Sequence, residues 1–324
     1  MAKVLVLGGA GFIGRHVCLA LLGRGHEVVV GTRRPRRAGL RLPPALQRCE
    51  RREAHLDWLT TAANWSALLR DVEVVVNAVG ILRERGYETY ERVHYRGPGA
   101  LAAACRTKGI RLVHVSALGL HLEAASRFIR SKLRGESAVA SAGGDYVLVR
   151  PSLLDGEDGF GARWLRRAAR WPAHVVPANA AGRIAALHVD DLAEAIAALC
   201  DPTLRLPWRE VELGGPVARP LDAYLATLRA SANLGPARVL KLPGWLARLA
   251  AHVLDLLHVS PFSFGHYELL RRDNVPADNR LNFLLGRAPT PLGERAPREL
   301  SLPGVPARLP ALPDAGGPAS WAGP

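Results

Sequence analysis

The sequence predicts an α/β fold built on a doubly wound parallel sheet, with a smaller C-terminal α/β lobe. An apolar run at residues 4–7 leads directly into a glycine-rich turn and a helical pattern at residues 12–24. Short apolar runs then alternate with helical patterns as far as residue 150, which is typical of parallel sheets. The run at residues 72–76 is apolar throughout, as expected of a strand buried on both faces. These observations indicate a Rossmann-type unit.

The glycine-rich turn is the first candidate binding site. Gly8, Gly11 and Gly14 are spaced three apart, with Phe12 and Ile13 between the last two. In a dinucleotide-binding turn, one glycine allows the tight turn, one lets the pyrophosphate approach the backbone, and one lets the helix pack closely on the strand. The N–H groups and the dipole of the helix start then favour the phosphates. The alternative is a strand-to-helix turn that binds nothing.

The second predicted strand, residues 27–31, bears on the choice of dinucleotide. An acidic residue usually follows this strand in NAD-binding units and holds the ribose hydroxyls. Here the strand leads into Arg33 and Arg34, and guanidinium groups suit a 2′-phosphate. We therefore expect NADP(H), with NAD(H) as the alternative. The alternative is that the arginines belong to a solvated basic loop, because residues 33–52 contain eight arginines and one acid.

Further candidate cofactor contacts follow the later strands. Residues 55–58 are predicted to end a short third strand, where Asp57 and Trp58 could bracket an adenine. Asp57 could instead cap a helix starting near Thr60. Ligands of open α/β sheets bind beyond the carboxyl ends of strands, so we expect cofactor contacts from the residues that follow the fourth, fifth and sixth strands. These residues are Asn77, Ala78, Val79, Gly80, Ser116 and Pro151.

Beyond Pro151 the strand–helix alternation breaks down. We expect a basic helix at residues 163–170, a strand at 184–189, a helix capped by Asp190 and Asp191 through residue 200, a strand at 210–213 and a helix at 221–228. Residues 240–258 form an amphipathic pattern, predicted to pack within the lobe or to contact a membrane surface or partner. Nine prolines in residues 286–324 predict a loosely ordered tail.

These elements suggest one unit over residues 1–285. Its Rossmann part comprises mainly residues 1–150 with 184–200, and its lobe comprises residues 151–183 and 205–285. A length of 324 residues and a hydrophobic content of 48% fit such a unit.

Composition narrows the classes of function. The four cysteines form no Cys-x-x-Cys pair, which argues against a metal knuckle or a disulfide framework, so we expect no metal site and a reducing, cytoplasmic location. The first strand starts by Val4, so we expect no signal peptide. The net charge is +14, but only four of 43 basic residues are lysine. Such a bias over the whole chain resembles genome composition, and nucleic-acid binding is not favoured.

Several motifs together resemble the extended short-chain dehydrogenase/reductase superfamily. They are GGAGFIG at residues 8–14, Asp57, the NAVG segment at 77–80, Ser116, Lys132 with Gly135 and Glu136, VRPS at 149–152 and HVDDLAEAI at 188–196. Within it, SALGL at 116–120, FIRSKLRGE at 128–136, ELGGP at 212–216 and LLRRDNV at 269–275 are similar to an atypical branch. This branch includes the nucleotide-binding accessory subunit of respiratory complex I and its bacterial homologues.

The resemblance implies a catalytic pattern that this chain lacks in one position. Active members use Ser, Tyr and Lys, with Tyr four residues before Lys. The Tyr hydroxyl transfers the proton, while Lys lowers its pKa and holds the nicotinamide ribose. This chain has Ser116 and Lys132, but Phe128 stands at the Tyr position. Loss of a general acid typically removes about 10²- to 10⁴-fold of rate, whereas cofactor binding does not need the hydroxyl.

Three functional interpretations remain open. The first is an NAD(P)(H)-binding protein with weak or no catalysis, such as an accessory or assembly protein of a membrane redox complex, located in the cytoplasm or peripherally at the inner membrane. The second is an active reductase, epimerase or dehydratase of a sugar-nucleotide, quinone or lipid-like substrate. Its proton donor would be another residue, with His121, Ser126, Tyr87 and Tyr146 as candidates. The third is a structural or partner-binding fold with an empty site, which the intact glycines argue against.

Overall fold

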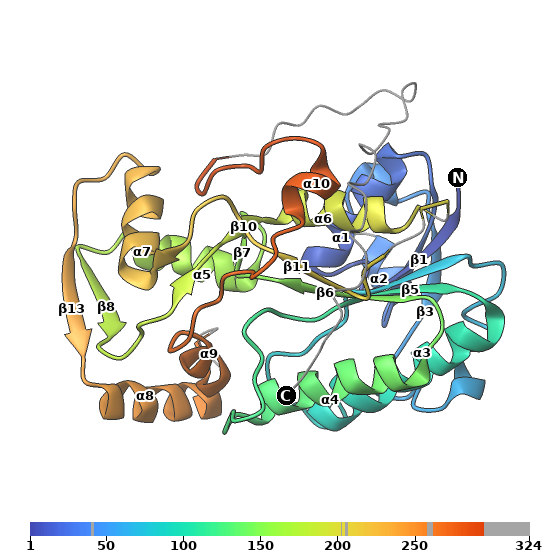
Figure 1. Ribbon diagram of the computed structural model, residues 1–324, viewed down its shortest axis with the longest axis horizontal. Helices are drawn as coiled ribbons and strands as arrows, with labels where there is room; N and C mark the ends of the chain where they lie inside the picture. The colour runs from blue at the N-terminus through green and yellow to red at the C-terminus, as the bar shows by residue number, and fades with distance from the viewer. Residues whose placement is uncertain (40–41, 202, 205–206, 258–261, 295–324) are drawn as a thin grey trace, which may run out of the picture.

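The computed structural model of the chain describes residues 1–39, 42–201, 203–204, 207–257 and 262–294. Its centre is a seven-stranded sheet in the order β11-β6-β5-β4-β1-β2-β3 (Figure 1). Every neighbouring pair is parallel. The strands are β1 (Lys3–Leu7), β2 (Glu27–Thr32), β3 (Glu50–Glu53), β4 (Val74–Asn77), β5 (Arg111–Val115), β6 (Tyr146–Pro151) and β11 (Glu210–Leu213). The predicted doubly wound sheet is confirmed.

Helices cover both faces of the sheet. One face carries α1 (Phe12–Gly23), α6 (Val189–Leu199) and α10 (Leu281–Leu285), and the other carries α3 (Gly97–Lys108) and α4 (Arg127–Ala142). Alternate residues of β1 enter the two cores, Val4 and Val6 on the first face and Leu5 and Leu7 on the second. Because successive side chains of a strand point to opposite faces, a strand between two helical layers is apolar throughout. Short connecting helices are α2 (Pro35–Gly39), η1 (Pro44–Leu46), η2 (Ala62–Trp65) and η3 (Glu91–Arg96).

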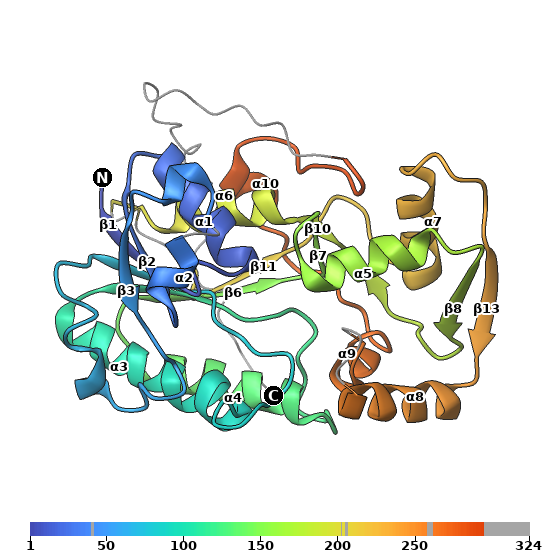
Figure 2. The same cartoon turned by 180° about the vertical axis from the view of Figure 1, so that it is seen from behind.

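The smaller lobe lies beyond the carboxyl edge of the sheet, as Figure 2 shows from behind. Its helices are α5 (Phe160–Ala169), α7 (Leu221–Ala230), α8 (Gly244–Leu257) and α9 (Phe264–Leu269). Three strand pairs support them: β7 (Leu154–Asp155) with β10 (Leu187–His188), β9 (Arg183–Ile184) with β12 (Arg219–Pro220), and β8 (Ala173–Pro177) with β13 (Arg238–Leu242). Its cores are separate from those of the sheet. The predicted smaller α/β lobe is therefore present.

Several expectations about individual elements were wrong, and the first residues of the predicted amphipathic pattern, 240–242, belong to β13. The third strand lies at Glu50–Glu53 and residues 55–58 form the loop after it. The expected strand at residues 184–189 is split between β9 and β10, which have different partners. The N-cap of α6 is His188, whose Nδ1 accepts the Asp190 N–H at 3.2 Å, so the two aspartates lie in the first turn instead.

The start of the proline-rich segment differs from the expected loose tail. The Arg287 guanidinium donates to Asp191 at 2.7 Å and to Glu194 at 2.9 Å on α6. The Thr290 N–H and hydroxyl also donate to Asp191, at 2.6 and 3.0 Å. Asp191 is fully buried, so these bonds satisfy a carboxylate that water does not reach. Residues 295–324 lie outside the described residues.

Across the part of the chain that the structure describes, none of the helices is both long and apolar enough to traverse a bilayer. The same residues contain no group of three or more His, Cys, Asp and Glu side chains arranged to hold a metal ion.

Candidate functional site

The glycine turn after β1 is a close-packed backbone cradle. Gly8 has φ +74°, a conformation that favours glycine. A Cβ on Gly14 would lie 2.2 Å from the Gly8 carbonyl oxygen, and one on Gly11 would lie 3.0 Å from the same atom. The Gly11 N–H donates to that oxygen at 2.7 Å. The three glycines therefore bring the first turn of α1 against the end of β1.

The N-terminus of α1 is available to an anion. Gly11 is its N-cap and supplies no side-chain hydrogen bond, and the first turn contains no acidic residue. The ring of Phe12 packs beneath Gly156 and Gly159, where an added Cβ would lie within 2.9 Å of ring atoms. These contacts bring the loop after β7 over the helix start. Free N–H groups and the helix dipole at such a position attract phosphate.

The arginines after β2 are placed at the carboxyl edge of the sheet, beside the glycine turn. Both side chains are exposed, and Arg33 forms an ion pair with Glu88. Glu88 belongs to the loop after β4, so part of the positive charge of Arg33 is already matched. Arg34 precedes α2 and its carbonyl accepts the Ala38 N–H at 2.9 Å.

The end of β4 is held by a buried amide. Asn77 is fully buried and its Oδ1 accepts the Val79 N–H at 3.2 Å. Its Nδ2 therefore faces His114 on β5, at 3.1 Å from Nδ1, and donates to it. Ala78 and Val79 pack against Gly8, where a Cβ would lie 3.1 Å from the Ala78 carbonyl. The turn after β4 thus contacts the glycine turn directly.

A π-helix, η3, supplies a buried histidine next to this turn. The Nε2 of His94 accepts the Ile81 N–H at 3.1 Å, so its proton is on Nδ1, which donates to Ser131 Oγ at 2.9 Å. Ser131 in turn donates to the Phe128 carbonyl at 2.8 Å. A chain of hydrogen bonds thus joins the loop after β4 to the first turn of α4. π-Helices occur frequently at functional sites.

Phe128 and Lys132 lie on successive turns of α4. The Lys132 Nζ is 5.9 Å from the centroid of the Phe128 ring. That ring is surrounded by Tyr90 at 6.0 Å, His94 at 5.6 Å and His266 of α9 at 6.0 Å between centroids. Phe128 is therefore part of a packed aromatic cluster that connects the sheet domain to the lobe.

Ser116 follows β5 and has an unsatisfied hydroxyl. Its backbone N–H donates to the Val149 carbonyl at 2.8 Å, which fixes the chain beside β6. Its Oγ is buried and has no hydrogen-bond partner within the described part of the chain. A buried unpaired hydroxyl costs about 1–3 kcal/mol, so a ligand oxygen beside it would restore the lost bond.

Burial shifts the pKa of the ionisable groups around Phe128. Burial lowers the pKa of Lys132 to about 8, although the Glu136 carboxylate acts in the opposite direction. Burial and, to a smaller extent, the Lys132 charge lower the pKa of His114 to about 3 and that of His94 well below its ordinary value. Burial lowers the pKa of His266 to about 4. The three histidines are therefore neutral near pH 7, and Lys132 is the group that titrates close to it.

Asp57 and Trp58 occupy the loop after β3. Asp57 is buried and Trp58 is 62% exposed, stacked on His55 at 4.0 Å between centroids. Asp57 does not cap the following helix, because the N-cap of η2 is Thr61 and no side chain bonds there. Pro151 ends β6, and its carbonyl accepts the Leu118 N–H at 2.9 Å, which joins it to the segment after Ser116.

The four alternative proton donors lie at different places in the fold. Tyr146 is the first residue of β6 and therefore lies at the amino edge of the sheet, opposite Ser116. Tyr87 is 76% exposed in the loop after β4. The Ser126 N–H donates to the Glu268 carboxylate of α9 at 2.6 Å, close to Phe128. The His121 Nδ1 is buried with no bond to any described residue.

Sequence reasoning missed His94, His114, Ser131 and His266. His114 had a readable signal, because it is a polar residue inside the apolar run of β5. The others had none, since their roles depend on contacts between elements distant in the sequence.

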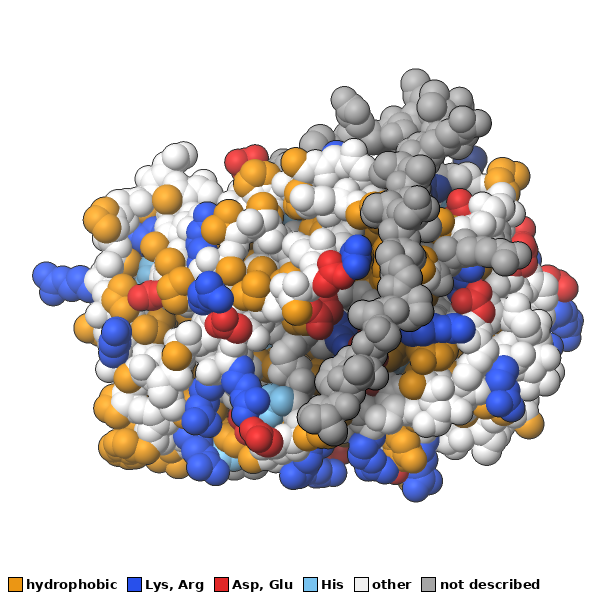
Figure 3. Space-filling model, viewed as in Figure 1, with side chains coloured by type: hydrophobic (Ala, Val, Ile, Leu, Met, Phe, Trp, Pro, Cys, Tyr) orange, Lys and Arg blue, Asp and Glu red, His pale blue; other side chains and the backbone are white. Residues whose placement is uncertain are grey.

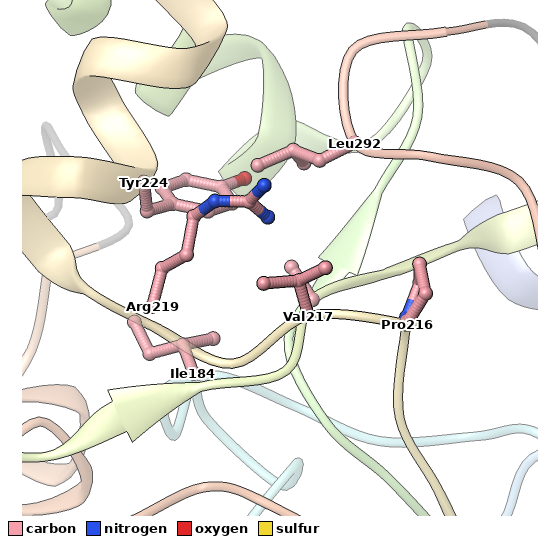
Figure 4. A pocket seen from close by; sticks show the side chains of 7 residues that line it. Ile184, Pro216, Val217, Arg219, Tyr224 and Leu292 are labelled. Carbon is pink, nitrogen blue, oxygen red and sulfur yellow. The ribbon is translucent and has the colours of Figure 1, made fainter.

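Cavities in the lobe include two lined by residues that the structure describes. One of about 10 Å³ is enclosed by side chains that include Tyr224, Arg219 and Leu292 (Figure 4), and it is too small for more than about one water molecule. The other, of about 410 Å³, is lined by the basic face of α5 together with Glu157 and Glu294. Of its arginines, Arg166 is neutralised by buried Asp155, at 2.7 Å.

Comparison with known proteins identifies relatives along most of the chain. The family model described as "NAD dependent epimerase/dehydratase family" matches residues 4–205. The chain is 31% identical over 285 residues to a ceramide reductase of Caulobacter vibrioides, covering 85% of this chain and 86% of that protein. It is also 31% identical over 166 residues to the mitochondrial NADH dehydrogenase [ubiquinone] 1 alpha subcomplex subunit 9 of Mus musculus. That match covers 48% of this chain and only 41% of the mouse protein.

Solved structures share the fold at low sequence identity. The NADPH-dependent quinone oxidoreductase QOR2 of Escherichia coli, complexed with NADPH, superimposes with a TM-score of 0.67 and 19% identity, covering 90% of this chain and 97% of that one. The UDP-glucuronic acid 4-epimerase of Bacillus cereus, in complex with UDP-glucuronic acid and NAD, superimposes with a TM-score of 0.63 and 18% identity. This match covers 90% of this chain and 95% of that one. At such identities the likeness concerns the fold.

Proposed function

The chain belongs to the NAD dependent epimerase/dehydratase family, and from this premise we propose that it binds NADP(H) at the glycine turn with weak or no catalysis. The proposal rests chiefly on Phe128. The position four residues before Lys132 carries a ring packed among Tyr90, His94 and His266, and a phenyl ring has no proton to transfer. Binding and catalysis are therefore separable in this site.

Four features support a bound dinucleotide. The backbone cradle of Gly8 and Gly14 has no room for a Cβ, and the start of α1 carries neither a cap nor an acid. The resemblance implies that the unpaired Ser116 hydroxyl and the partly buried Lys132 would hold the nicotinamide end. A nicotinamide held there supplies or accepts hydride. Asp57, Trp58 and the segment Asn77, Ala78, Val79 and Gly80 would line the adenosine and pyrophosphate side.

The NADP(H) preference is proposed from the end of β2. No carboxylate follows this strand to bind the 2′-hydroxyl, and Arg34 is exposed beside the glycine turn. Arg33 would have to exchange its pairing with Glu88 for the 2′-phosphate, so Arg34 carries more of the preference. NAD(H) remains the alternative cofactor.

Calorimetric titration tests both parts of the cofactor proposal. We expect wild-type protein to bind NADPH more tightly than NADH, and Arg34→Glu to weaken NADPH binding about 10- to 100-fold, the range for a charge-assisted contact. NADH affinity should not change, and the exposed Arg37→Glu on α2 is the matched control. If neither NADPH nor NADH bound, the proposed function would be excluded. If NADH bound more tightly than NADPH, only the proposed preference for NADP(H) would be excluded.

Phe128→Tyr tests the catalytic part. If the remaining groups are in place, the added hydroxyl should raise turnover by orders of magnitude over a nearly inactive wild type, measured with NADPH and carbonyl substrates. High turnover by the wild-type protein would contradict the proposal of weak catalysis.

A second candidate function is an active reductase with another proton donor. It is favoured by the unpaired buried Nδ1 of His121 and by the extensive similarity to a ceramide reductase. In such a reaction the cofactor's hydride would reduce a carbonyl of a lipid-like, quinone or sugar-nucleotide substrate, and His121 would give the proton. Tyr146 is disfavoured as the proton donor, because it lies at the amino edge of the sheet, opposite Ser116. Loss of wild-type turnover in His121→Gln, with NADPH affinity retained, would support this candidate.

The accessory interpretation also involves a partner. A membrane redox complex remains a proposal drawn from the partial similarity to the mouse NADH dehydrogenase subunit. Co-purification of the chain with such a complex from its native cell would support it, and purification as an isolated protein from detergent-solubilised membranes would contradict it.

A further inference from the structure

The outer end of the C-terminal lobe carries an unusual concentration of exposed apolar side chains. On α8, Trp245 is 72% exposed, Leu249 54% and Val253 44%. These residues are four apart and lie along one face of the helix. On the adjoining strands, Leu240 of β13 and its neighbour in register, Val175 of β8, are 52% and 56% exposed. We call these five residues the outer apolar surface. Their number is unusual for a helix and ribbon at the edge of a water-soluble lobe.

The packing of α8 differs from that of an ordinary surface helix. Its inner face contacts α9 through Ala247 and Ala251, which are almost fully buried against Tyr267. In a typical amphipathic helix of a globular protein the large apolar residues face the core. Here the two fully buried residues are small, Leu246 and Leu254 are half-buried, and Trp245, Leu249 and Val253 face outward. The folding of the lobe therefore does not account for Trp245, Leu249 and Val253.

This end of the molecule carries a net positive charge. The elements α5, β8, α7, β13 and α8 together contain seven Lys and Arg residues and two acidic residues, Asp222 and Asp255. Arg238 and Lys241 flank Leu240 on β13, and Arg248 is next to Leu249 on α8. Figure 3 shows basic and hydrophobic side chains intermingled over this end, at the left of the view.

These observations select one kind of occupant. A second copy of the chain would bring the same positive surfaces together, so self-association is electrostatically unfavourable. A bilayer with anionic headgroups complements both properties, because its interface accommodates Trp and aliphatic side chains while the headgroups attract Lys and Arg. We propose that the outer apolar surface, flanked by Arg238, Lys241 and Arg248, docks the lobe on an anionic membrane.

The docking leaves the nucleotide site accessible in principle and does not rest on the proposed function. The glycine turn and the ends of β1, β4 and β5 lie on the sheet domain, whereas α8 and β13 lie at the far end of the lobe (Figures 1 and 2). The chain would therefore attach peripherally, with its lobe at the bilayer and its sheet domain away from it.

Sedimentation with lipid vesicles tests the proposal on the full chain. The probes are vesicles of phosphatidylcholine alone and of phosphatidylcholine with phosphatidylglycerol. We expect binding to the anionic vesicles, weak binding to the neutral ones, and release as salt screens the charges. Lys241→Glu should weaken binding to anionic vesicles at least about 5-fold, since one basic residue near such a surface contributes about that factor.

A matched pair of variants separates docking from nonspecific effects. Val253→Glu places a carboxylate in the outer apolar surface, whereas Val217→Glu places one at a valine of similar exposure, 47% against 44%, beside the small cavity of Figure 4. We expect Val253→Glu to abolish vesicle binding and Val217→Glu to preserve it. Thermal melting monitors the fold of each variant, and Leu249→Glu replaces Val253→Glu if the latter unfolds.

Three results would overturn the proposal. One is the absence of wild-type binding to anionic vesicles. Another is equal binding by the Val253→Glu and Val217→Glu proteins. The third is a dimer that Trp245→Glu dissociates while vesicle binding is unchanged, which would assign the surface to contact between copies.

Discussion

The carbonyl oxygen of His94 lies so close to Gly135 that a Cβ on this glycine would be 1.9 Å from it. This contact brings α4 against η3 at the turn that carries His94. The hydrogen bonds from His94 through Ser131 to the Phe128 carbonyl depend on the same approach. The glycine in the segment 128–136 thus has a packing role that places Phe128 and Lys132 relative to the sheet.

Gly135→Ala should therefore separate α4 from η3. We expect a loss of about 1–3 kcal/mol in the free energy of unfolding, the usual range for overpacking, together with weaker NADPH binding. Gly99→Ala is the control and should lose less stability, because its Cβ would meet only the Ala138 methyl at 3.1 Å. Urea unfolding of both variants measures the difference, and equal stabilities would contradict the role of the close contact.

Gly14→Ala should abolish nucleotide binding. The added methyl would lie 2.2 Å from the Gly8 carbonyl oxygen, so the turn and the helix start must move apart. Gly23→Ala at the other end of α1 is the control, because nothing lies within 4 Å of its Cβ. Titration with NADPH should show no binding by the first variant and unchanged affinity for the second. Wild-type affinity in Gly14→Ala would place the nucleotide elsewhere.

NADPH binding should depend on pH through Lys132. Burial lowers the pKa of Lys132 to about 8 in the free protein, and contact with the ribose oxygens would favour the charged form. The affinity should then be constant below pH 8 and fall above it, by at most about tenfold per pH unit. Lys132→Met should bind more weakly and lose this dependence. A flat profile for the wild-type protein would show that Lys132 does not contact the cofactor.

The buried histidines should make the fold sensitive to acid. The pKa values of His94, His114 and His266 in the folded chain lie below the unfolded value of about 6.5. Because the unfolded chain takes up protons first, stability is fully present above about pH 6.5 and falls as the pH drops toward about 4. Each histidine contributes up to about 1.4 kcal/mol per pH unit.

Urea unfolding between pH 7.5 and 4.5 measures this slope. His266→Asn should reduce it, whereas His252→Asn, at an exposed position on α8, should leave it unchanged. An identical slope in both variants would mean that His266 does not stay neutral in the fold.

Arg287→Ala should destabilise the packing of α6. It leaves the fully buried Asp191 with only Thr290 as a hydrogen-bond donor among the contacts described above. We expect a loss of about 1–3 kcal/mol. Arg183→Ala removes an exposed pair with Asp273 at 2.8 Å and should cost much less, because solvent screens an exposed ion pair. Chemical denaturation compares the two, and equal losses would contradict the importance of burial.

The sheet was largely predictable because its strands are buried on both faces. The runs at residues 4–7, 27–31, 72–76 and 210–213 coincide closely with β1, β2, β4 and β11. The third strand was misplaced because β3 is an edge strand of sequence ERRE, mostly exposed, with no apolar pattern. Residues 240–242 of β13 were included in the amphipathic pattern because Leu242 continues the apolar spacing of α8, and periodicity alone does not distinguish such a short apolar stretch from a helix.

The candidate site was predictable only along single segments. Gly14, Asn77 and Ser116 follow strands, so their placement at one edge of the sheet could be inferred. The aromatic cluster around Phe128 could not be inferred, because His266 reaches it from α9, more than a hundred residues away in the sequence. Such contacts depend on how the lobe packs, which local patterns do not encode.

The bonds between Asp191 and Arg287 have a consequence for synthesis on the ribosome. The two residues are 96 positions apart, so at about 5–20 residues per second a nascent α6 exists for about 5–20 s before its cation is made. During that interval a carboxylate destined for full burial has no positive partner, so α6 packs on α1 less stably than in the finished chain. Ribosome-bound fragments that end before Arg287 should therefore be more sensitive to protease at α6 than the complete chain.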